Sequence, residues 1–202
     1  MDKYITTPLN DNIINDLNAG DYVYISGIIY SARDAAHKRM YNSLLKGENI
    51  PFDLKNSMIY YLGPTPEREG QVIGSAGPTT SSRMDKYTPL LMEHGLKGMI
   101  GKGKRSQEVI ENIKKYTGVY LAAIGGAGAL LSKKIISSKI IGYEDLGTEA
   151  IREMYVKDFP TIVVIDSKGN NLYETVMKEW FYDFSKDIMY VGSYKYISYK
   201  YL

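Results

Sequence analysis

Two kinds of apolar spacing alternate along this chain, and this alternation restricts the fold more than any other feature of the sequence. Residues 21–31, DYVYISGIIYS, are β-branched and aromatic and predict a strand, with Gly27 at a bulge or a close backbone approach. The next segment changes to helical spacing. Ser31 with Asp34 three residues later predicts a capping box for a helix that ends at Gly47. A strand followed by such a helix is typical of α/β and α+β domains.

The same alternation continues to about residue 175. A second capping pair, Ser82 with Asp85, predicts a helix over residues 83–94 that Pro89 kinks or splits. Residues 119–146 predict a strand, a glycine turn, a short helix and another strand. Further helices are expected at residues 10–18 and 106–116, and further strands at residues 57–63, 71–77, 97–101 and 161–165. The mixture predicts an α/β domain with mixed sheets and flanking helices.

Beyond Thr175 the composition changes to WFYDFSKDIMYVGSYKYISYKYL, which is crowded with tyrosine. Aromatic clusters usually serve burial, so a packed terminal segment is favoured over a binding platform. We therefore expect one domain over residues 1–175 and a Tyr-rich C-terminal extension over residues 176–202 that packs on it.

Composition excludes several classes of function. The chain has 25 basic and 23 acidic residues and a net charge of +2, which gives no broad field for nucleic acid or an anionic membrane. No apolar run reaches the roughly 18 residues of a membrane span, and the N-terminus is too polar for a signal peptide. We expect a soluble, cytoplasmic protein. The Met1 start favours a separate subunit over a fragment.

Cysteine is absent and only two histidines, His37 and His94, are present. This excludes disulfides, thiol nucleophiles and thiolate metal ligands supplied by this chain. A self-contained zinc or iron site is not expected, although a carboxylate site stays open. Any soft metal must come from a partner.

Arg33 and Arg83 each fall close to a predicted helix start, where the macrodipole disfavours a cation by about 0.3 to 1 kcal/mol. An anion bound at the helix N-terminus would explain both positions, because main-chain N–H groups and a guanidinium would then hold the same ligand. A carboxylate and a phosphate both qualify. The alternative is that each arginine points outward into water.

Lys102 lies between two glycines, Gly101 and Gly103, which allow a close approach of the backbone to a ligand. It is a candidate third cation, and a flexible basic turn is the alternative. The spacing is not that of a Walker loop. GGAGALL at residues 125–131 resembles a dinucleotide loop, but Leu131 fills the third glycine position, so close packing of a helix on a sheet explains it equally well.

Three further residues adjoin these cations. His37 lies one turn after Arg33 on the same predicted helix face, where it either contacts the ligand or has a structural role. Thr79 and Thr80 lie in the loop before Arg83. Hydrogen bonding within the loop is their default role, whereas general-base chemistry would require nearby cations and a dry pocket.

At these residues the sequence resembles a known family. YSARDAAHKRM, YYLGPTPEREGQVIGSAGPTTSSRMDKYTPLLMEHGLKGMIGKGKRS, AAIGGAGALLSKKI and TEAIREMYVKDFPTIVVIDSKGNNLYE are similar, in this order, to the β subunit or C-terminal domain of iron-sulphur class I fumarases and L-tartrate dehydratases. The resemblance covers about residues 5–175. It implies a swivelling β/β/α domain that takes part in the reversible addition of water to a dicarboxylate.

The resemblance also implies roles for individual residues. Arg33, Arg83 and Lys102 match the substrate-binding cations of the family, and Thr79 matches the threonine proposed as the base that removes the C3 proton. Supporting roles are expected for three neighbours: Asp34, His37 and Thr80. The acid is expected from the partner, and no residue of this chain is expected to bind metal.

The implied protein is the β subunit of a hydro-lyase that hydrates fumarate to L-malate and is active only with an α subunit. Three cysteines of that partner hold a 4Fe-4S cluster, and an α2β2 complex is a possible assembly. Three alternatives stay open: an L-tartrate or mesaconate-type dehydratase subunit, a non-catalytic anion-binding module of the same fold, and a self-sufficient metal enzyme.

Overall fold

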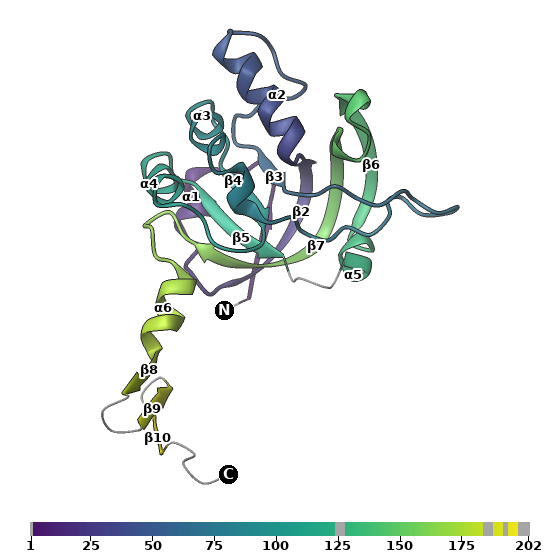
Figure 1. The fold of residues 1–202 in the computed structure, drawn as a ribbon. Coiled ribbons are helices and arrows are strands. Elements are labelled where there is room, and N and C mark those ends of the chain that lie inside the picture. The colour runs from purple at the N-terminus through teal and green to yellow at the C-terminus, as the bar shows by residue number, and fades with distance from the viewer. Residues whose placement is uncertain (1, 124–127, 184–187, 192–193, 198–202) are drawn as a thin grey trace.

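The computed structural model describes residues 2–123, 128–183, 188–191 and 194–197, with side chains up to residue 175. Its main feature is a seven-stranded sheet with the strand order β1-β2-β3-β4-β5-β7-β6 (Figure 1). The strands are β1 (Asp2–Thr6), β2 (Tyr22–Ser31), β3 (Met58–Tyr60), β4 (Gly98–Gly101), β5 (Val119–Ala123), β6 (Ile135–Gly142) and β7 (Ile151–Ile165). The helices are α1 (Asp11–Asn15), α2 (Asp34–Leu45), α3 (Thr88–Glu93), α4 (Gln107–Lys115), α5 (Gly128–Ser132) and α6 (Leu172–Glu179), with 3-10 helices η1 (Ser81–Met84) and η2 (Glu144–Glu149).

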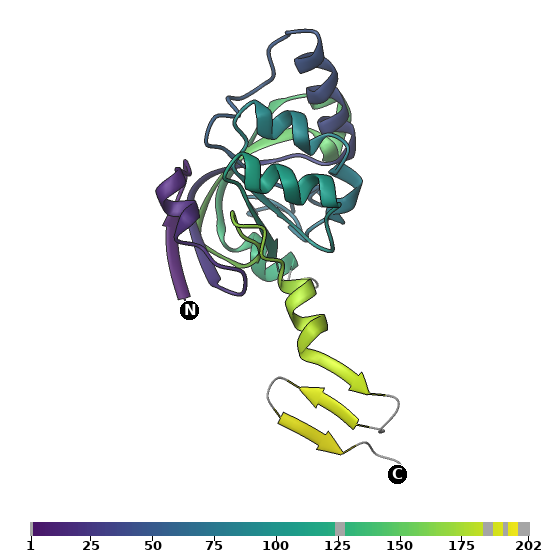
Figure 2. The same ribbon diagram turned by 90° about the vertical axis from the view of Figure 1, so that its left-hand side faces the viewer.

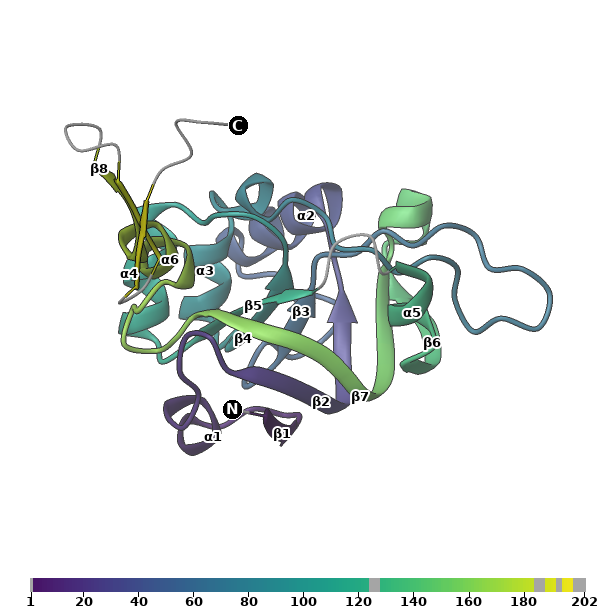
Figure 3. The same ribbon diagram turned by 90° about the horizontal axis from the view of Figure 1, so that it is seen from below.

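Each strand from β1 through β5 pairs in parallel with the next one. The long strand β7 then closes the sheet on itself. β7 runs antiparallel to β5 and also to β2, so that β2, β3, β4, β5 and β7 form a closed ring of pairings. Figure 3 shows β7 curving from β6 toward β5. Because β2, β3 and β4 are adjacent and parallel, their carboxyl ends meet at one edge of the sheet.

Two apolar clusters fill the domain, one enclosed by the strands and one beneath the helices. Alternate residues of β3 explain the division: Met58 and Tyr60 belong to the enclosed cluster, and Ile59 belongs to the other. A layer of α2, α3 and α4 covers the second cluster (Figure 2). Strands that are buried on both faces read as continuous apolar runs, as β3 and β4 do. The predicted mixed α/β domain with flanking helices is confirmed.

Gly27 fulfils both expectations for a glycine inside a strand. The register of β2 against β7 shifts between Ile25 and Gly27, and Gly27 has a φ of 120°. A Cβ at this position would lie 2.4 Å from Oγ1 of Thr7. The bulge and the close approach therefore occur together.

Both predicted capping boxes are wrong. Ser31 is the last residue of β2, and its Oγ accepts a hydrogen bond from Arg152 N, so Arg33 becomes the N-cap of α2 without a side-chain cap. At the second site, Ser82 lies within η1, and α3 begins only at Thr88 because Pro89 fits the first turn of a helix. The predicted helix is split into two pieces, but the break falls at residues 85–87, before Pro89, which lies in the first turn of α3.

The strand predicted at residues 71–77 is also wrong. Both edges of β3 are paired, with β2 and β4, so this segment cannot pair beside the strand that precedes it. The segment instead belongs to a long loop that projects from the domain, fixed at its base by a bridge between Leu62 and Pro78. The helix predicted at residues 10–18 is shorter than expected, because α1 ends at Asn15.

The other predicted elements are confirmed at 57–63, 97–101, 106–116 and 161–165, and β5, α5 and β6 follow in the predicted order. The glycine turn between β5 and α5 falls at residues 124–127, outside the described ones.

After α6, the strands β8 (Trp180–Asp183), β9 (Ile188–Val191) and β10 (Tyr194–Ile197) form an antiparallel sheet (Figure 2). Packing of the Tyr-rich extension concerns side chains outside the described ones and stays a prediction. Among the described residues, no helix is both long and apolar enough to cross a membrane.

Candidate functional site

Residues predicted to bind an anion gather at the carboxyl edge of β2, β3 and β4. Arg33 follows the end of β2, Lys102 follows the end of β4, and Thr79 lies in the loop after β3. Main-chain hydrogen bonds fix this loop, since Thr79 N donates to Tyr61 O at 2.7 Å and Ser81 N donates to Lys102 O at 2.9 Å. A bridge also pairs Thr80 with Lys102. The fold therefore brings these segments together as predicted.

Asp34 lies between the two arginines. Arg83 Nε donates to Asp34 Oδ1 at 2.7 Å, and Arg33 Nε lies 3.6 Å from Oδ2. The Arg33 side chain is 24% exposed and that of Arg83 is 50% exposed. Within the described part of the chain, neither arginine uses its Nη atoms in a hydrogen bond. Arg83 is thus held by a hydrogen bond at Nε, whereas Arg33 Nε has two anionic neighbours but no hydrogen-bond partner among the described residues. The Nη atoms of both arginines are left for a ligand.

Arg83 does not lie at the beginning of a helix, so this part of the prediction is wrong. It is the third residue of the four-residue η1 and lies near the end of that turn, where a cation is not disfavoured. Arg33 is at the N-cap of α2, as expected for a residue at a helix start. Of the two arginines, only Arg33 places its positive charge at the N-terminus of a helix, where the macrodipole disfavours it.

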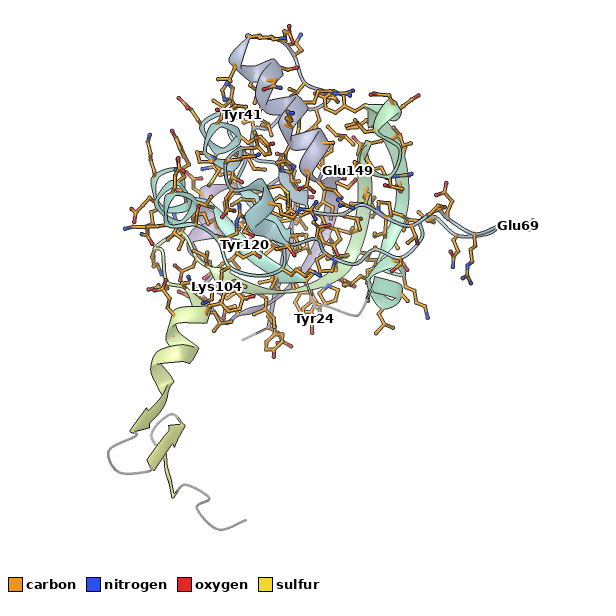
Figure 4. The ribbon with its side chains drawn as sticks, in the orientation of Figure 1. Tyr24, Tyr41, Glu69, Lys104, Tyr120 and Glu149 are labelled. Atoms are coloured by element: carbon orange, nitrogen blue, oxygen red, sulfur yellow. The ribbon has the colours of Figure 1, made fainter. Side chains whose placement is uncertain are left out.

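Glu149, which the sequence reasoning missed, compensates that charge. Its Oε2 accepts a hydrogen bond of 2.8 Å from Ala35 N in the first turn of α2, and its Oε1 lies 3.5 Å from Arg33 Nε. Figure 4 shows Glu149 beside the beginning of α2. No local pattern connects residues 114 positions apart, so a single sequence held no signal for this contact.

The charges at this edge favour an anionic ligand. Arg33, Arg83 and Lys102 supply three positive charges, and Asp34 and Glu149 supply two negative charges, which leaves one positive charge in excess. Lys102 is exposed at the edge. Guanidinium and ammonium groups together suit a small anion that carries carboxylate or phosphate groups.

His37 is fully buried behind Arg33. Its Nδ1 lies 2.9 Å from Arg33 O, one turn earlier in α2. Burial, together with the positive charge of Arg105, lowers the pKa of His37 to about 4, although the hydrogen bond to Arg33 O and the charge of Asp34 act in the opposite direction. The neutral ring therefore carries its proton on Nδ1 and donates it to the Arg33 carbonyl. Of the two roles that the sequence left open, this geometry provides a structural one.

A buried ion pair between Arg105 and Asp85, which the sequence analysis also missed, lies beneath the loops of the site. Arg105 has no exposed side-chain surface and donates through Nε to Asp85 Oδ1 at 2.6 Å and through Nη2 to Thr88 Oγ1 at 2.9 Å. Its guanidinium also lies over the rings of Tyr61 and Tyr120, at 5.3 Å and 5.0 Å from their centroids. Through Tyr120, this cluster contacts both the loop that carries Thr79 and the loop that carries Lys102.

Tyr120 connects that buried cluster to the site. Its hydroxyl donates to Gly103 O at 2.8 Å and lies 2.8 Å from Ser81 Oγ. Burial raises the pKa of Tyr120, so the hydroxyl stays protonated and able to donate. One buried hydroxyl thus holds the segment after Lys102 against the segment after Thr80.

The described residues contain no group of three or more histidine, aspartate or glutamate side chains placed to hold a metal ion. The sequence contains no cysteine. The donor set of this chain therefore does not fit the thiolate ligation of an iron-sulphur cluster.

Comparisons with known proteins agree with the resemblance in the motifs. The family model of the fumarase C-terminus matches residues 4–176. Fumarate hydratase 2 of Leishmania major is 40% identical over 160 residues, which cover 78% of this chain and 28% of that protein. The class I aerobic fumarate hydratase of Escherichia coli (strain K12) is 40% identical over 154 residues, which cover 75% of this chain and 28% of that protein.

A third relative has nearly the same length as this chain. The putative L(+)-tartrate dehydratase subunit beta of Methanocaldococcus jannaschii is 38% identical over 183 residues, which cover 88% of this chain and 94% of that protein. The chain thus spans 28% of the length of the two fumarate hydratases and almost all of the tartrate dehydratase subunit.

Proposed function

The chain belongs to the fumarase C-terminus family, and from that premise we propose that it is the β-type subunit of a hydro-lyase that hydrates fumarate to L-malate. One observation carries the proposal: Asp34 accepts a hydrogen bond from Arg83 Nε and faces Arg33 Nε at 3.6 Å, at the same sheet edge as Lys102, and the Nη atoms of both arginines are left for an anion. Two adjacent guanidinium groups suit the carboxylates of a short dicarboxylate.

The proposed mechanism assigns binding and proton transfer to this chain. Arg33, Arg83 and Lys102 bind the carboxylates of the substrate. In the dehydration direction, the Thr79 hydroxyl, ionised under the influence of the neighbouring cations, accepts the proton from C3 of malate. Negative charge develops on the carboxylate adjacent to C3 and is relieved when the C2–O bond breaks and the hydroxyl leaves as water. The arginines stabilise that charge more in the transition state than in the ground state, which accelerates the step.

The other half of the active site is proposed to lie on an α subunit. Because this chain has no cysteine, the 4Fe-4S cluster is assigned to three cysteines of that partner, together with the acid that protonates the leaving hydroxyl. A cytoplasmic α2β2 complex and a swivelling β/β/α domain, which moves relative to the partner, belong to the same proposal. Asp34, His37 and Thr80 support the residues that contact the substrate.

The test is the fumarate hydratase activity of the chain reconstituted with a cysteine-bearing α partner. We expect activity only in the complex, and loss of turnover in Thr79→Ala and Arg83→Ala while the complex stays intact. Lys102→Ala is compared with Lys104→Ala, an exposed lysine two positions away. Fumarate hydration by the isolated, iron-free chain, or undiminished turnover in Thr79→Ala, would contradict the proposal.

A second candidate is an L-tartrate dehydratase subunit. It is favoured by the Methanocaldococcus jannaschii relative, because that protein matches this chain over 94% of its own length. The reconstituted complex is assayed on L-malate, L-tartrate and a methylated fumarate. The largest kcat/KM decides between the substrates, and a preference for L-tartrate would replace fumarate in the proposal.

A further inference from the structure

We propose that Glu149 is a positioning residue, which holds the guanidinium of Arg33 in the orientation that binds the substrate carboxylate. The identity of the ligand rests on the proposed function. The arrangement of Glu149 and Arg33 does not, because it follows from contacts within this chain.

A single carboxylate connects the first turn of α2 to the side chain at its N-cap. The Glu149 side chain is 21% exposed; Oε2 accepts from Ala35 N at 2.8 Å and Oε1 lies 3.5 Å from Arg33 Nε. The N–H group of Ala35 is one of those that no helical carbonyl can pair. The internal carboxylate thus occupies this main-chain donor, so an incoming anion meets the Nη atoms of Arg33.

The backbone conformation of η2 places the Glu149 carboxylate beside the first turn of α2. Tyr143, just before η2, has a left-handed φ of 59°, and Gly147 has φ 58° and ψ −119°, a conformation that strongly favours glycine. Asp145 anchors the same element on α2 by pairing with Arg39 through two hydrogen bonds of 2.7 Å. Glu149 therefore approaches α2 on an element that is fixed at a second point.

Without this carboxylate, the guanidinium of Arg33 would have Asp34 as its remaining anionic neighbour, and Asp34 already accepts from Arg83. The two arginines would then compete for one carboxylate. A guanidinium held on its Nε side loses less conformational freedom when its Nη atoms bind a ligand. Glu149 should thus affect ligand binding more than the chemical step.

The first experiment separates KM from kcat in the reconstituted complex. Glu149→Gln keeps an oxygen that accepts from Ala35 N but removes the charge that faces Arg33. We expect KM for the dicarboxylate to rise about tenfold, since Arg33 loses a partly buried ion-pair partner 3.5 Å from its Nε, with kcat changed less than KM. Glu144→Gln, at an exposed position of the same 3-10 helix, should leave both constants unchanged. A fall in kcat at constant KM would overturn the proposal.

A double-mutant cycle tests whether Glu149 acts through Arg33. Arg33→Ala, Glu149→Gln and the double variant are compared by kcat/KM. We expect Glu149→Gln to have almost no further effect when Arg33 is absent. Independent, multiplicative losses would overturn the positioning role. Glu149→Asp, which keeps the charge, should recover part of the affinity.

A third readout requires no catalysis. In the full chain labelled with ¹⁵N, the Nε–H resonance of Arg33, assigned by its loss in Arg33→Lys, should shift in Glu149→Gln and stay in place in Glu144→Gln. An unmoved resonance would overturn this inference even if fumarate is hydrated. A shifted resonance in a chain whose complex hydrates no dicarboxylate would instead reject the proposed function alone.

Discussion

Asp34 Oδ1 accepts a hydrogen bond of 2.7 Å from Nε of Arg83, although the two residues are 49 positions apart in the chain. The contact joins the beginning of α2 to η1. The other carboxylate oxygen of Asp34, Oδ2, lies 3.6 Å from Arg33 Nε. One carboxylate thus orients two cations that follow different strands of the sheet.

Asp34→Asn is expected to weaken substrate binding. The amide leaves one oxygen acceptor for two guanidinium groups and places an NH2 group against one of them, so KM should rise about tenfold, as for other charged hydrogen bonds. Steady-state kinetics of the reconstituted complex measure the change. Asp53→Asn, at an exposed position away from the site, is the matched control. An unchanged KM would show that Asp34 does not orient the arginines.

Arg105 is expected to stabilise the fold through its buried pair with Asp85. Arg105→Met leaves the Asp85 carboxylate, which also accepts from Ser106 N at 2.6 Å, without its buried cation. Breaking such a pair costs about 3 to 5 kcal/mol. Urea denaturation should reveal a loss of this size in the free energy of unfolding, whereas the exposed Lys104→Met should change it little. Equal stabilities of the two variants would contradict the prediction.

His37 is expected to make the stability of the chain fall in weak acid. Its pKa is about 4 in the folded chain and 6.5 in the unfolded chain, so the unfolded chain binds more protons between these values. The free energy of unfolding should therefore decrease by up to roughly 3 kcal/mol as the pH falls from 6.5 to 4. Denaturation at several pH values measures this decrease.

The two histidines of the chain provide the control for that pH dependence. His37→Gln should remove this part of it, because the titrating group is then absent. His94→Gln should preserve it, since His94 is exposed. If His37→Gln leaves the acid sensitivity unchanged, other groups cause it.

The sequence was sufficient to bring the cations and Asp34 together but not to reveal Glu149, the second carboxylate beside Arg33. Arg33 and Lys102 each follow a strand that apolar runs identify, and parallel strands bring such positions to one edge. Glu149 and Arg105 act through partners 20 or more positions away, and their local patterns resemble those of ordinary surface residues. Long-range polar contacts therefore set the limit of the prediction.

The wrong capping boxes have the same physical cause. Short spacing suggested that Asp34 and Asp85 would cap their own helices, but each carboxylate accepts from a distant arginine instead. An ion pair with an arginine competes with a local cap for the same carboxylate oxygens. The segment at 71–77 was misread because the pattern of a strand does not reveal whether a sheet edge is free.

Gly63 is expected to define the space for the Arg33 side chain. A Cβ at Gly63 would lie 2.5 Å from Cδ and 2.7 Å from Nη1 of Arg33. Gly63→Ala must therefore displace the guanidinium, and KM for the dicarboxylate should rise about tenfold while the fold persists, because a misplaced clamp loses binding energy.

Gly77→Ala, in the same loop, is the matched control for Gly63→Ala. A Cβ at Gly77 comes no closer than 4.0 Å to its nearest neighbour, Gly128 Cα, so the added methyl group meets no obstacle. Steady-state kinetics of both variants, with thermal unfolding as the measure of folding, test the prediction. Equal KM values in two folded variants would mean that the ligand does not require the observed position of Arg33. The conformation that Glu149 and Asp34 hold would then not be the one that binds substrate.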